Sequence, residues 1–264
     1  MRQTALGTAL CAPYDCKGSL IHWAEACSAA GLALVRMMHA ILYWLIWPLA
    51  HFLIRWMFDF DYVRQAQLPL GPKVIVANHP TTIDPFIIAV SLAEPIHILI
   101  TEPIFRAPLL GRYLRSAGHI PVGLAEGRSA FNRALRLLQK GRSILVFPEG
   151  SLSPDEGGTN PARTGAARLA LVAGVPIIPV GIYIARERTL IIQNNRMEAR
   201  GRGKFVLDGP YKATQGRPLY VEGNVEDREI VKELSTWIML RINSLVRESE
   251  QRVMALMPAL EPGQ

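Results

Sequence analysis

A histidine and an aspartate stand five residues apart directly after a short apolar stretch. The stretch Lys73–Ala77 runs into Asn78 and His79, and Asp84 follows in front of Pro85. A carboxylate that binds one imidazole nitrogen fixes the tautomer and leaves the other nitrogen free to act as a general base. A lone histidine near an aspartate is more often structural than catalytic. A second feature is therefore needed before chemistry is assigned to this pair.

The second feature follows another apolar stretch. Ser143–Phe147 continues into Pro148-Glu149-Gly150-Ser151. Ligands of open α/β sheets bind outside the carboxyl ends of the strands, so two parallel neighbouring strands would bring His79 and Glu149 to one crevice. Gly150 would let the backbone approach a phosphate or an oxyanion closely. The alternative for either motif alone is an ordinary turn after a strand.

The elements that position these residues alternate along the chain from about residue 70. This alternation predicts an α/β fold with a mostly parallel mixed sheet covered by helices, and Asp84-Pro85 predicts a helix with Asp84 as its N-cap. The expected strands are Lys73–Ala77, His97–Thr101, His119–Val122, Ser143–Phe147, Pro176–Ile184, Lys204–Leu207 and Leu219–Glu222. The expected helices are Pro85–Leu92, Arg106–Ala117, Arg128–Lys140, Ala162–Ala173 and Glu226–Glu248.

An apolar segment precedes this domain. Half of all residues are hydrophobic, and Met37–Ile54 contains no Asp, Glu, Lys or Arg. Its length is at the lower limit for crossing a bilayer, so a spanning helix, a re-entrant segment and a helix in the interface all stay open, beside a buried helix of a soluble protein. We expect residues 1–65 to form an extension with a membrane-associating helix and residues 66–264 to form the α/β domain. The first 20 residues lack the apolar core of a signal peptide, which predicts a catalytic domain at the cytoplasmic side of the cytoplasmic membrane.

The charge of the chain is compatible with this placement. The net charge is +7, which suits a surface close to anionic lipid. No zinc-finger spacing, RNP-type motif or basic recognition helix is present, so a nucleic-acid partner is not expected. The basic stretch Arg186–Lys204 is either a solvated hairpin or a phospholipid-facing loop. The histidines are scattered without metal-ligand spacing, and neither a metal nor a cofactor is expected.

The ordered motifs resemble those of the PlsC-type glycerolipid acyltransferases, the superfamily of lysophosphatidic acid and glycerol-3-phosphate acyltransferases. The resemblance covers about Lys73 to Ile184. Asn78-His79 with Asp84 is similar to the NH-x4-D motif, in which the family uses the histidine as base. Phe147–Ser151 is similar to the FPEG[TS] motif, which is associated with the glycerol phosphate of the acceptor. Val175–Gly181, which includes Pro179, is similar to a late VPxxPV block linked to the acyl chain.

Two departures from the family pattern remove cations from the expected phosphate site. The GxIPV stretch of the family continues into Asp-Arg, where this chain has Gly123-Leu124, and the FPEG motif continues into Thr-Arg-Ser, where this chain has Ser151-Leu152-Ser153. Arg128 and Arg163 are the nearest replacements. For Arg163, solvation of the following helix is an equal alternative.

The resemblance implies an O-acyltransferase that moves a fatty acyl group from acyl-CoA or acyl carrier protein to a lysophospholipid hydroxyl. The acceptor most often implied is 1-acyl-sn-glycerol-3-phosphate, which gives phosphatidic acid. Another lysophospholipid, an amino-acid lipid or a glycolipid remains an alternative, as does a non-catalytic lipid-binding protein. The implied catalytic residues are His79 and Asp84. The implied substrate-binding residues are Asn78, Glu149, Gly150, Ser151, Arg128, Arg163 and Pro179.

Overall fold

A computed structural model describes residues 52–92, 94–123, 126–193 and 202–255. The chain divides into two compact units, Met1–Leu49 and Ala50–Gln264, and all described residues belong to the second. The expected membrane-associating segment lies outside the described residues except for residues 52–58, which are helical. Among the described residues, no helix combines the length and the apolar character needed to span a bilayer.

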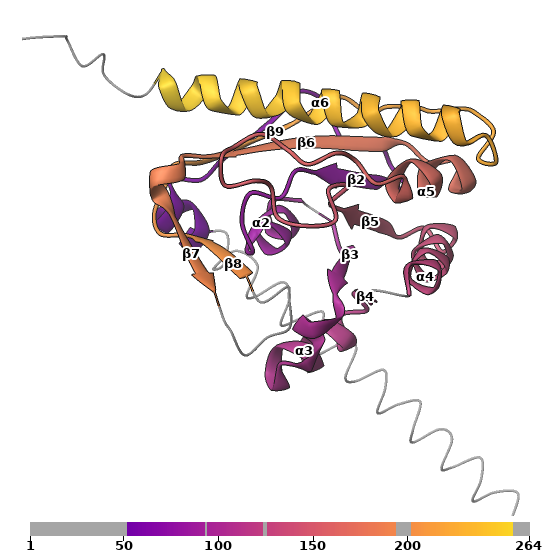
Figure 1. The fold of residues 1–264 in the computed structure, drawn as a ribbon, viewed down its shortest axis with the longest axis horizontal. Coiled ribbons are helices and arrows are strands. Elements are labelled where there is room, and N and C mark those ends of the chain that lie inside the picture. The colour runs from indigo at the N-terminus through magenta and orange to yellow at the C-terminus, as the bar shows by residue number, and fades with distance from the viewer. Residues whose placement is uncertain (1–51, 93, 124–125, 194–201, 256–264) are drawn as a thin grey trace, which may run out of the picture. The chain divides into compact units, whose positions relative to one another are not determined.

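A seven-stranded sheet forms the centre of this unit (Figure 1). The five strands β6, β2, β5, β3 and β4 run parallel, β9 is antiparallel to β6, and β1 is parallel to β9. The prediction of a mostly parallel mixed sheet is thereby confirmed. In sheet order the strands are β1 (Asp61–Arg64), β9 (Tyr211–Gln215), β6 (Ile177–Ile184), β2 (Val74–Ala77), β5 (Ser143–Val146), β3 (Ile96–Thr101) and β4 (Ile120–Val122).

Helices cover both faces of the sheet because successive residues of the central strands point to opposite faces. Val74 and Val76 of β2 pack in one core with residues of α4, α5 and α6, whereas Ile75 and Ala77 pack in a second core with residues of α2. Figure 1 shows α6 running along one side of the sheet and α2 on the other. The helices are α2 (Asp84–Ser91), α3 (Pro108–Ser116), α4 (Gly127–Gln139), α5 (Gly165–Ala173) and α6 (Arg228–Met254), with short 3-10 turns at Glu102–Arg106 and Arg186–Arg188.

The structure differs from the sequence prediction at polar strands. Neither β1 nor β9 was expected. Both faces of β9 are buried, yet they carry polar residues such as Thr214 and Gln215 in place of an apolar pattern. Thr214 bonds Ser249 of α6, and Gln215 bonds the Ala66 carbonyl, so both are satisfied in the interior. Since β1 is a strand of the sheet, the folded unit begins before the expected boundary at residue 66.

Two further differences concern local elements. Leu219–Glu222 was expected to be a strand and makes only an isolated bridge between Leu219 and Ile177. The expected helix Arg106–Ala117 is divided into a 3-10 turn and α3, with Pro108 at the first position of α3.

The basic stretch that begins at Arg186 agrees with the hairpin alternative. It contains the two strands of a separate antiparallel sheet, β7 (Thr189–Gln193) and β8 (Arg202–Val206).

Helix α6 lies so close to β6 that only a glycine fits between them. A methyl group added at Gly181 would overlap the backbone of Val246 and Leu245. Overpacking of this kind costs about 1–3 kcal/mol. Gly181→Ala is therefore expected to lower the free energy of unfolding by that amount in urea titrations. Gly127→Ala, where the added methyl meets no atom within 4 Å, is the matched control. Equal midpoints for the two variants would contradict this packing.

Candidate active site

The two motifs meet at one edge of the sheet, as expected for parallel neighbouring strands. Strands β2 and β5 pair in register from Val74 opposite Ile144, so the turns that follow them start side by side. The backbone N–H of His79 donates to Glu149 Oε1 at 3.0 Å. The site is thus built at the carboxyl ends of two central strands.

The His79 ring is fixed by a carboxylate and an aromatic neighbour. Nδ1 lies 2.9 Å from Asp84 Oδ2, and the Phe147 ring stacks on the imidazole at a centroid distance of 4.1 Å. Because an ionised carboxylate only accepts, Nδ1 is the donor in this hydrogen bond. Nε2 has no hydrogen-bond partner within the described part of the chain. The side chain keeps 18% of its surface exposed, so the free nitrogen belongs to a partly open ring.

Asp84 is wholly buried, and its carboxylate accepts hydrogen bonds from four groups. The N–H of Thr81 donates to Oδ2 at 2.7 Å, the hydroxyl of Thr81 donates to Oδ1, and the hydroxyl of Tyr211 donates to Oδ1 at 2.9 Å. His79 is the fourth donor. The expectation that Asp84 caps α2 is wrong: the cap position is Ile83, and Asp84 is the first helical residue, with its carboxylate directed back to the preceding loop. A buried charge requires compensating hydrogen bonds, and the four donors around Asp84 supply them.

Tyr211 is the site residue that the sequence did not reveal. Tyr211 lies on β9 and pairs with Ile184 of β6. The end of β2, Ala77, pairs with Val180, which is four residues earlier on β6. This register carries the phenol past the end of β2 to Asp84. Burial, and then the neighbouring Asp84 carboxylate, raise the pKa of Tyr211 well above its usual value, so the hydroxyl remains a donor.

Glu149 binds the loop that follows β2 and the loop that follows β5. Oε1 accepts from the His79 N–H and the Ser153 hydroxyl, and Oε2 accepts from the N–H and the side-chain amide of Asn160. Glu149 was expected to contact substrate. That expectation stays a prediction. These contacts give its buried carboxylate a positioning role, because both oxygens hold protein groups that order the His79 backbone.

Asn78 has a similar role on the other side of β2. Its amide nitrogen donates to the Ile182 carbonyl at 2.8 Å, and its oxygen accepts from the Ile182 N–H at 2.7 Å. The buried side chain thereby continues the pairing of β2 with β6 by one residue. The substrate contact expected for Asn78 stays a prediction beside this reciprocal contact with the backbone.

A cation lies across the turn that follows β5. Gly150 has φ +67°, a conformation that favours glycine, and an added methyl would overlap the side chain of Arg163. The Arg163 N–H donates to the Pro148 carbonyl at 2.8 Å, which fixes its backbone beside the turn. Ser151 is exposed next to Gly150. The structure therefore brings Gly150, Ser151 and Arg163 together near Glu149.

Two other expected substrate residues lie elsewhere. Arg128 is exposed at the start of α4, the helix that follows β4. Strand β4 is three strands away from β2 in the sheet, a distance of roughly 14 Å. Pro179 is buried within β6 opposite Val76, and its ring lies next to Gly216. This position gives Pro179 a role in the packing of the sheet. It does not place Pro179 at the edge that carries His79.

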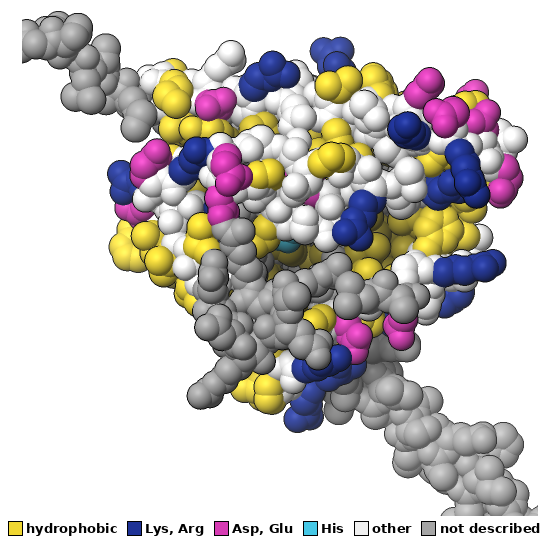
Figure 2. Space-filling view, in the orientation of Figure 1, with side chains coloured by type: hydrophobic (Ala, Val, Ile, Leu, Met, Phe, Trp, Pro, Cys, Tyr) yellow, Lys and Arg dark blue, Asp and Glu magenta, His cyan; other side chains and the backbone are white. Residues whose placement is uncertain are grey.

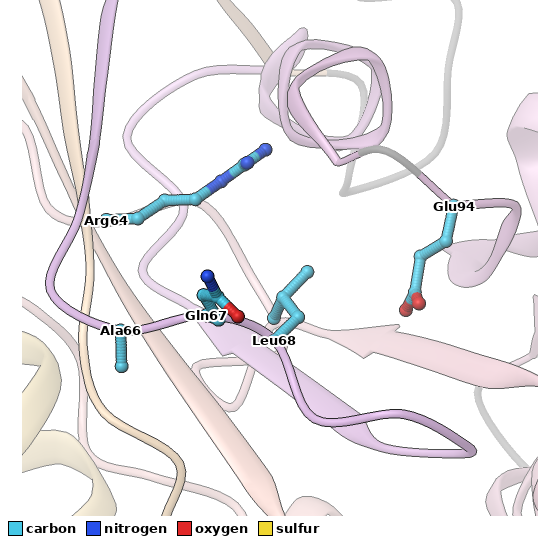
Figure 3. A pocket seen from close by; sticks show the side chains of 5 residues that line it. All are labelled: Arg64, Ala66, Gln67, Leu68 and Glu94. Carbon is cyan, nitrogen blue, oxygen red and sulfur yellow. The ribbon is translucent and has the colours of Figure 1, made fainter.

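Two hollows lie near opposite ends of β2. One, of about 690 Å³, borders Asn78 and Pro80 and is lined by residues of both charges from the loop 153–159, β6 and α6. The other, of about 580 Å³, is lined by Arg64, Ala66, Gln67, Leu68 and Glu94 (Figure 3). Glu94 binds Lys73, which precedes β2, whereas His79 follows it. The second hollow is thus at the opposite end of the strand from the imidazole. Among the described residues, no group of three His, Cys, Asp or Glu side chains is arranged to hold a metal ion.

Comparison with known proteins gives the same class as the fold and the site. The family model described as Acyltransferase matches residues 59–183, which contain His79, Asp84 and Glu149. A 1-acyl-sn-glycerol-3-phosphate acyltransferase of Borreliella burgdorferi is 34% identical over 113 residues, 42% of this chain and 45% of that protein. A lyso-ornithine lipid O-acyltransferase of Pseudomonas aeruginosa is 30% identical over 152 residues, 53% of this chain and 57% of that protein. The chain thus spans about half the length of these curated relatives.

A solved structure shares the fold. The crystal structure of the 1-acyl-sn-glycerophosphate acyltransferase PlsC from Thermotoga maritima superposes with a TM-score of 0.54 at 20% identity, over 76% of this chain and 75% of that one. The part of the chain that carries the parallel strands and the His-Asp pair is therefore similar to the proteins of the Acyltransferase model. The solved structure shows a shared fold.

The hydrogen bond from Tyr211 to Asp84 is testable through stability. Tyr211→Phe leaves a buried carboxylate oxygen with one donor fewer, and a hydrogen bond to a charged group contributes about 1.5–3 kcal/mol. Urea unfolding at neutral pH should show a loss of that size. Tyr113→Phe, at a tyrosine that is 55% exposed, should leave the midpoint unchanged. Identical behaviour of both variants would remove Tyr211 from the site.

Proposed function

We propose that this protein transfers a fatty acyl group from a thioester donor to the hydroxyl of a lysophospholipid, with His79 as the general base. The observation that carries the proposal is the 2.9 Å contact between His79 Nδ1 and Asp84 Oδ2, which leaves Nε2 as an acceptor. The family supports the same reaction class, because the matched relatives are named as lipid acyltransferases.

The reaction would be a single displacement. Nε2 of His79 removes the proton of the acceptor hydroxyl while its oxygen attacks the thioester carbonyl, and Asp84 stabilises the imidazolium that forms. The tetrahedral intermediate then expels the thiolate, which takes the proton from Nε2. Acyl-CoA or acyl carrier protein supplies the thioester, and the chemistry requires no cofactor.

The location proposed for this reaction is the cytoplasmic surface of the membrane. The acceptor is a lipid, and the uncharged run Met37–Ile54 provides the means to stay near the bilayer. The net charge of +7 favours an anionic leaflet.

The acceptor we favour is 1-acyl-sn-glycerol-3-phosphate, with Arg163 as the cation for its phosphate. Support comes from the position of Arg163 across Gly150, next to the loop that Glu149 ties to His79. A guanidinium binds phosphate oxygens through paired donors. Arg163 would thus compensate for Leu124 and Leu152, which occupy the positions of family arginines.

A second acceptor class is an amino-acid lipid such as lyso-ornithine lipid. The absence of arginines at positions 124 and 152 favours it, because an acceptor without a phosphomonoester does not need them. One of the matched relatives is named for this acceptor.

The base is tested by its removal. With acyl-CoA and a panel of lysolipids, His79→Ala should lower the rate of thiol release by about 10²–10⁴-fold, the range for loss of general-base catalysis. Thermal unfolding of the variant checks that the fold is intact. His97→Gln, a histidine of β3 outside the site, should keep the parental rate. Unchanged turnover in a folded His79→Ala protein would eliminate the proposed base.

The acceptor is tested by the charge at position 163. Arg163→Ala should lower kcat/KM for 1-acyl-sn-glycerol-3-phosphate by about 10–100-fold, as expected for a lost charge-assisted contact, and leave lyso-ornithine lipid unaffected. Arg136→Ala, an exposed arginine of α4, is the matched control. A preference of the parent for lyso-ornithine lipid, together with no effect of Arg163→Ala, would decide for the second acceptor.

A further inference from the structure

Helix α3 is held rigidly by one side only. Gly111 and Leu114 are its buried residues, and Gly111 lies so close to the Phe105 carbonyl that no side chain would fit there. Arg115 also donates to that carbonyl at 2.8 Å. The orientation of the helix is therefore fixed by its contact with the 3-10 turn Glu102–Arg106. The residues on the other side of the helix face outward.

The outward side of α3 is apolar. Leu109 is 82% exposed, Leu110 is 39% exposed and Tyr113 is 55% exposed. Tyr113 is four residues from Leu109 and three residues from Leu110, and side chains at these two spacings are neighbours on a helix, so the three side chains form one patch around Tyr113. Scattered exposed apolar residues are ordinary, but three on one side of a nine-residue helix indicate a surface that meets another apolar phase.

The surroundings of this patch are cationic. Arg106, Arg112 and Arg115 are exposed beside it, and α3 contains no acidic residue. Two acids lie near the 3-10 turn: Glu102 faces Arg106 at 3.4 Å between exposed groups, and Glu126 lies beside Glu102 at Gly123. Figure 2 shows basic and apolar side chains next to each other over α3 at the lower edge of the molecule.

The patch is on the side of the molecule that carries the site. Strands β3, β5 and β2 run parallel, and the chain enters the turn before α3 directly from the carboxyl end of β3. His79 follows the carboxyl end of β2. The loop that carries the base and the helix that carries the patch therefore leave the sheet at the same edge.

We propose that α3 docks the protein on an anionic lipid bilayer, with Leu109, Leu110 and Tyr113 among the headgroups and the flanking arginines on lipid phosphates. Apolar side chains ringed by arginines match an interfacial helix. A second copy of the chain fits less well, because stable dimers bury about 800 Å² on each partner and two such patches would bring arginines against arginines. The arrangement would hold the catalytic edge at the surface from which a lipid substrate comes.

The experiment reads the environment of α3 directly, so another anchor in the chain does not obscure it. In full-length protein with Cys11, Cys16 and Cys27 changed to serine, Leu109→Cys is labelled with a polarity-sensitive fluorophore. Vesicles of phosphatidylcholine with phosphatidylglycerol should raise the fluorescence at least about twofold, as expected for transfer to an interface. Phosphatidylcholine vesicles alone should give a smaller rise. The control is Leu240→Cys on α6, 58% exposed, whose label should not respond.

Three results with vesicles would overturn the proposal. These are no response at position 109, an equal response at position 240, and an equal response with and without phosphatidylglycerol. A rise that depends on protein concentration without vesicles would also overturn it, in favour of a second copy. Acyl transfer is not needed for the readout, so the proposed reaction and the docking surface succeed or fail separately.

Discussion

The Asp84 carboxylate is wholly buried, and a buried anion is stable only if nearby donors replace its lost hydration. Thr81 supplies two of the four donors, His79 a third and Tyr211 the fourth. These donors come from the loop after β2 and from a strand more than a hundred residues later. The need to compensate one charge therefore fixes the loop conformation, the imidazole orientation and the place where β9 passes the end of β2.

The backbone of the same loop is fixed by a second set of contacts. Glu149 holds the His79 N–H from the side of β5, and Asn78 holds the Ile182 backbone on the side of β6. The histidine is thus constrained at its main chain by two neighbouring strands and at its ring by Asp84 and Phe147. Preorganisation of this kind lowers the reorganisation required when a proton is transferred. Two residues that were expected to bind substrate, Asn78 and Glu149, thus also position the histidine.

Local features of the site were predictable from the sequence. The apolar runs of β2 and β5, the spacing of His79 and Asp84, and Gly150 after a strand are signals within short windows, and they gave the edge of the sheet at which the residues meet. The N-cap expectation for Asp84 failed because a local capping rule does not include donors from outside the helix. Tyr211 was not predictable, because its role depends on the register of β9 against β6, and no short-range pattern encodes that pairing.

The central claim is that Asp84 holds the imidazole with Nδ1 protonated and Nε2 free. Nitrogen-15 NMR of the labelled imidazoles measures this directly, with the His79 signals assigned by their loss in His79→Gln. The account predicts that neutral His79 is the Nδ1–H tautomer, with an unprotonated Nε2. A spectrum in which Nε2 carries the proton would contradict the proposed base, because the nitrogen that must accept the hydroxyl proton would already be occupied.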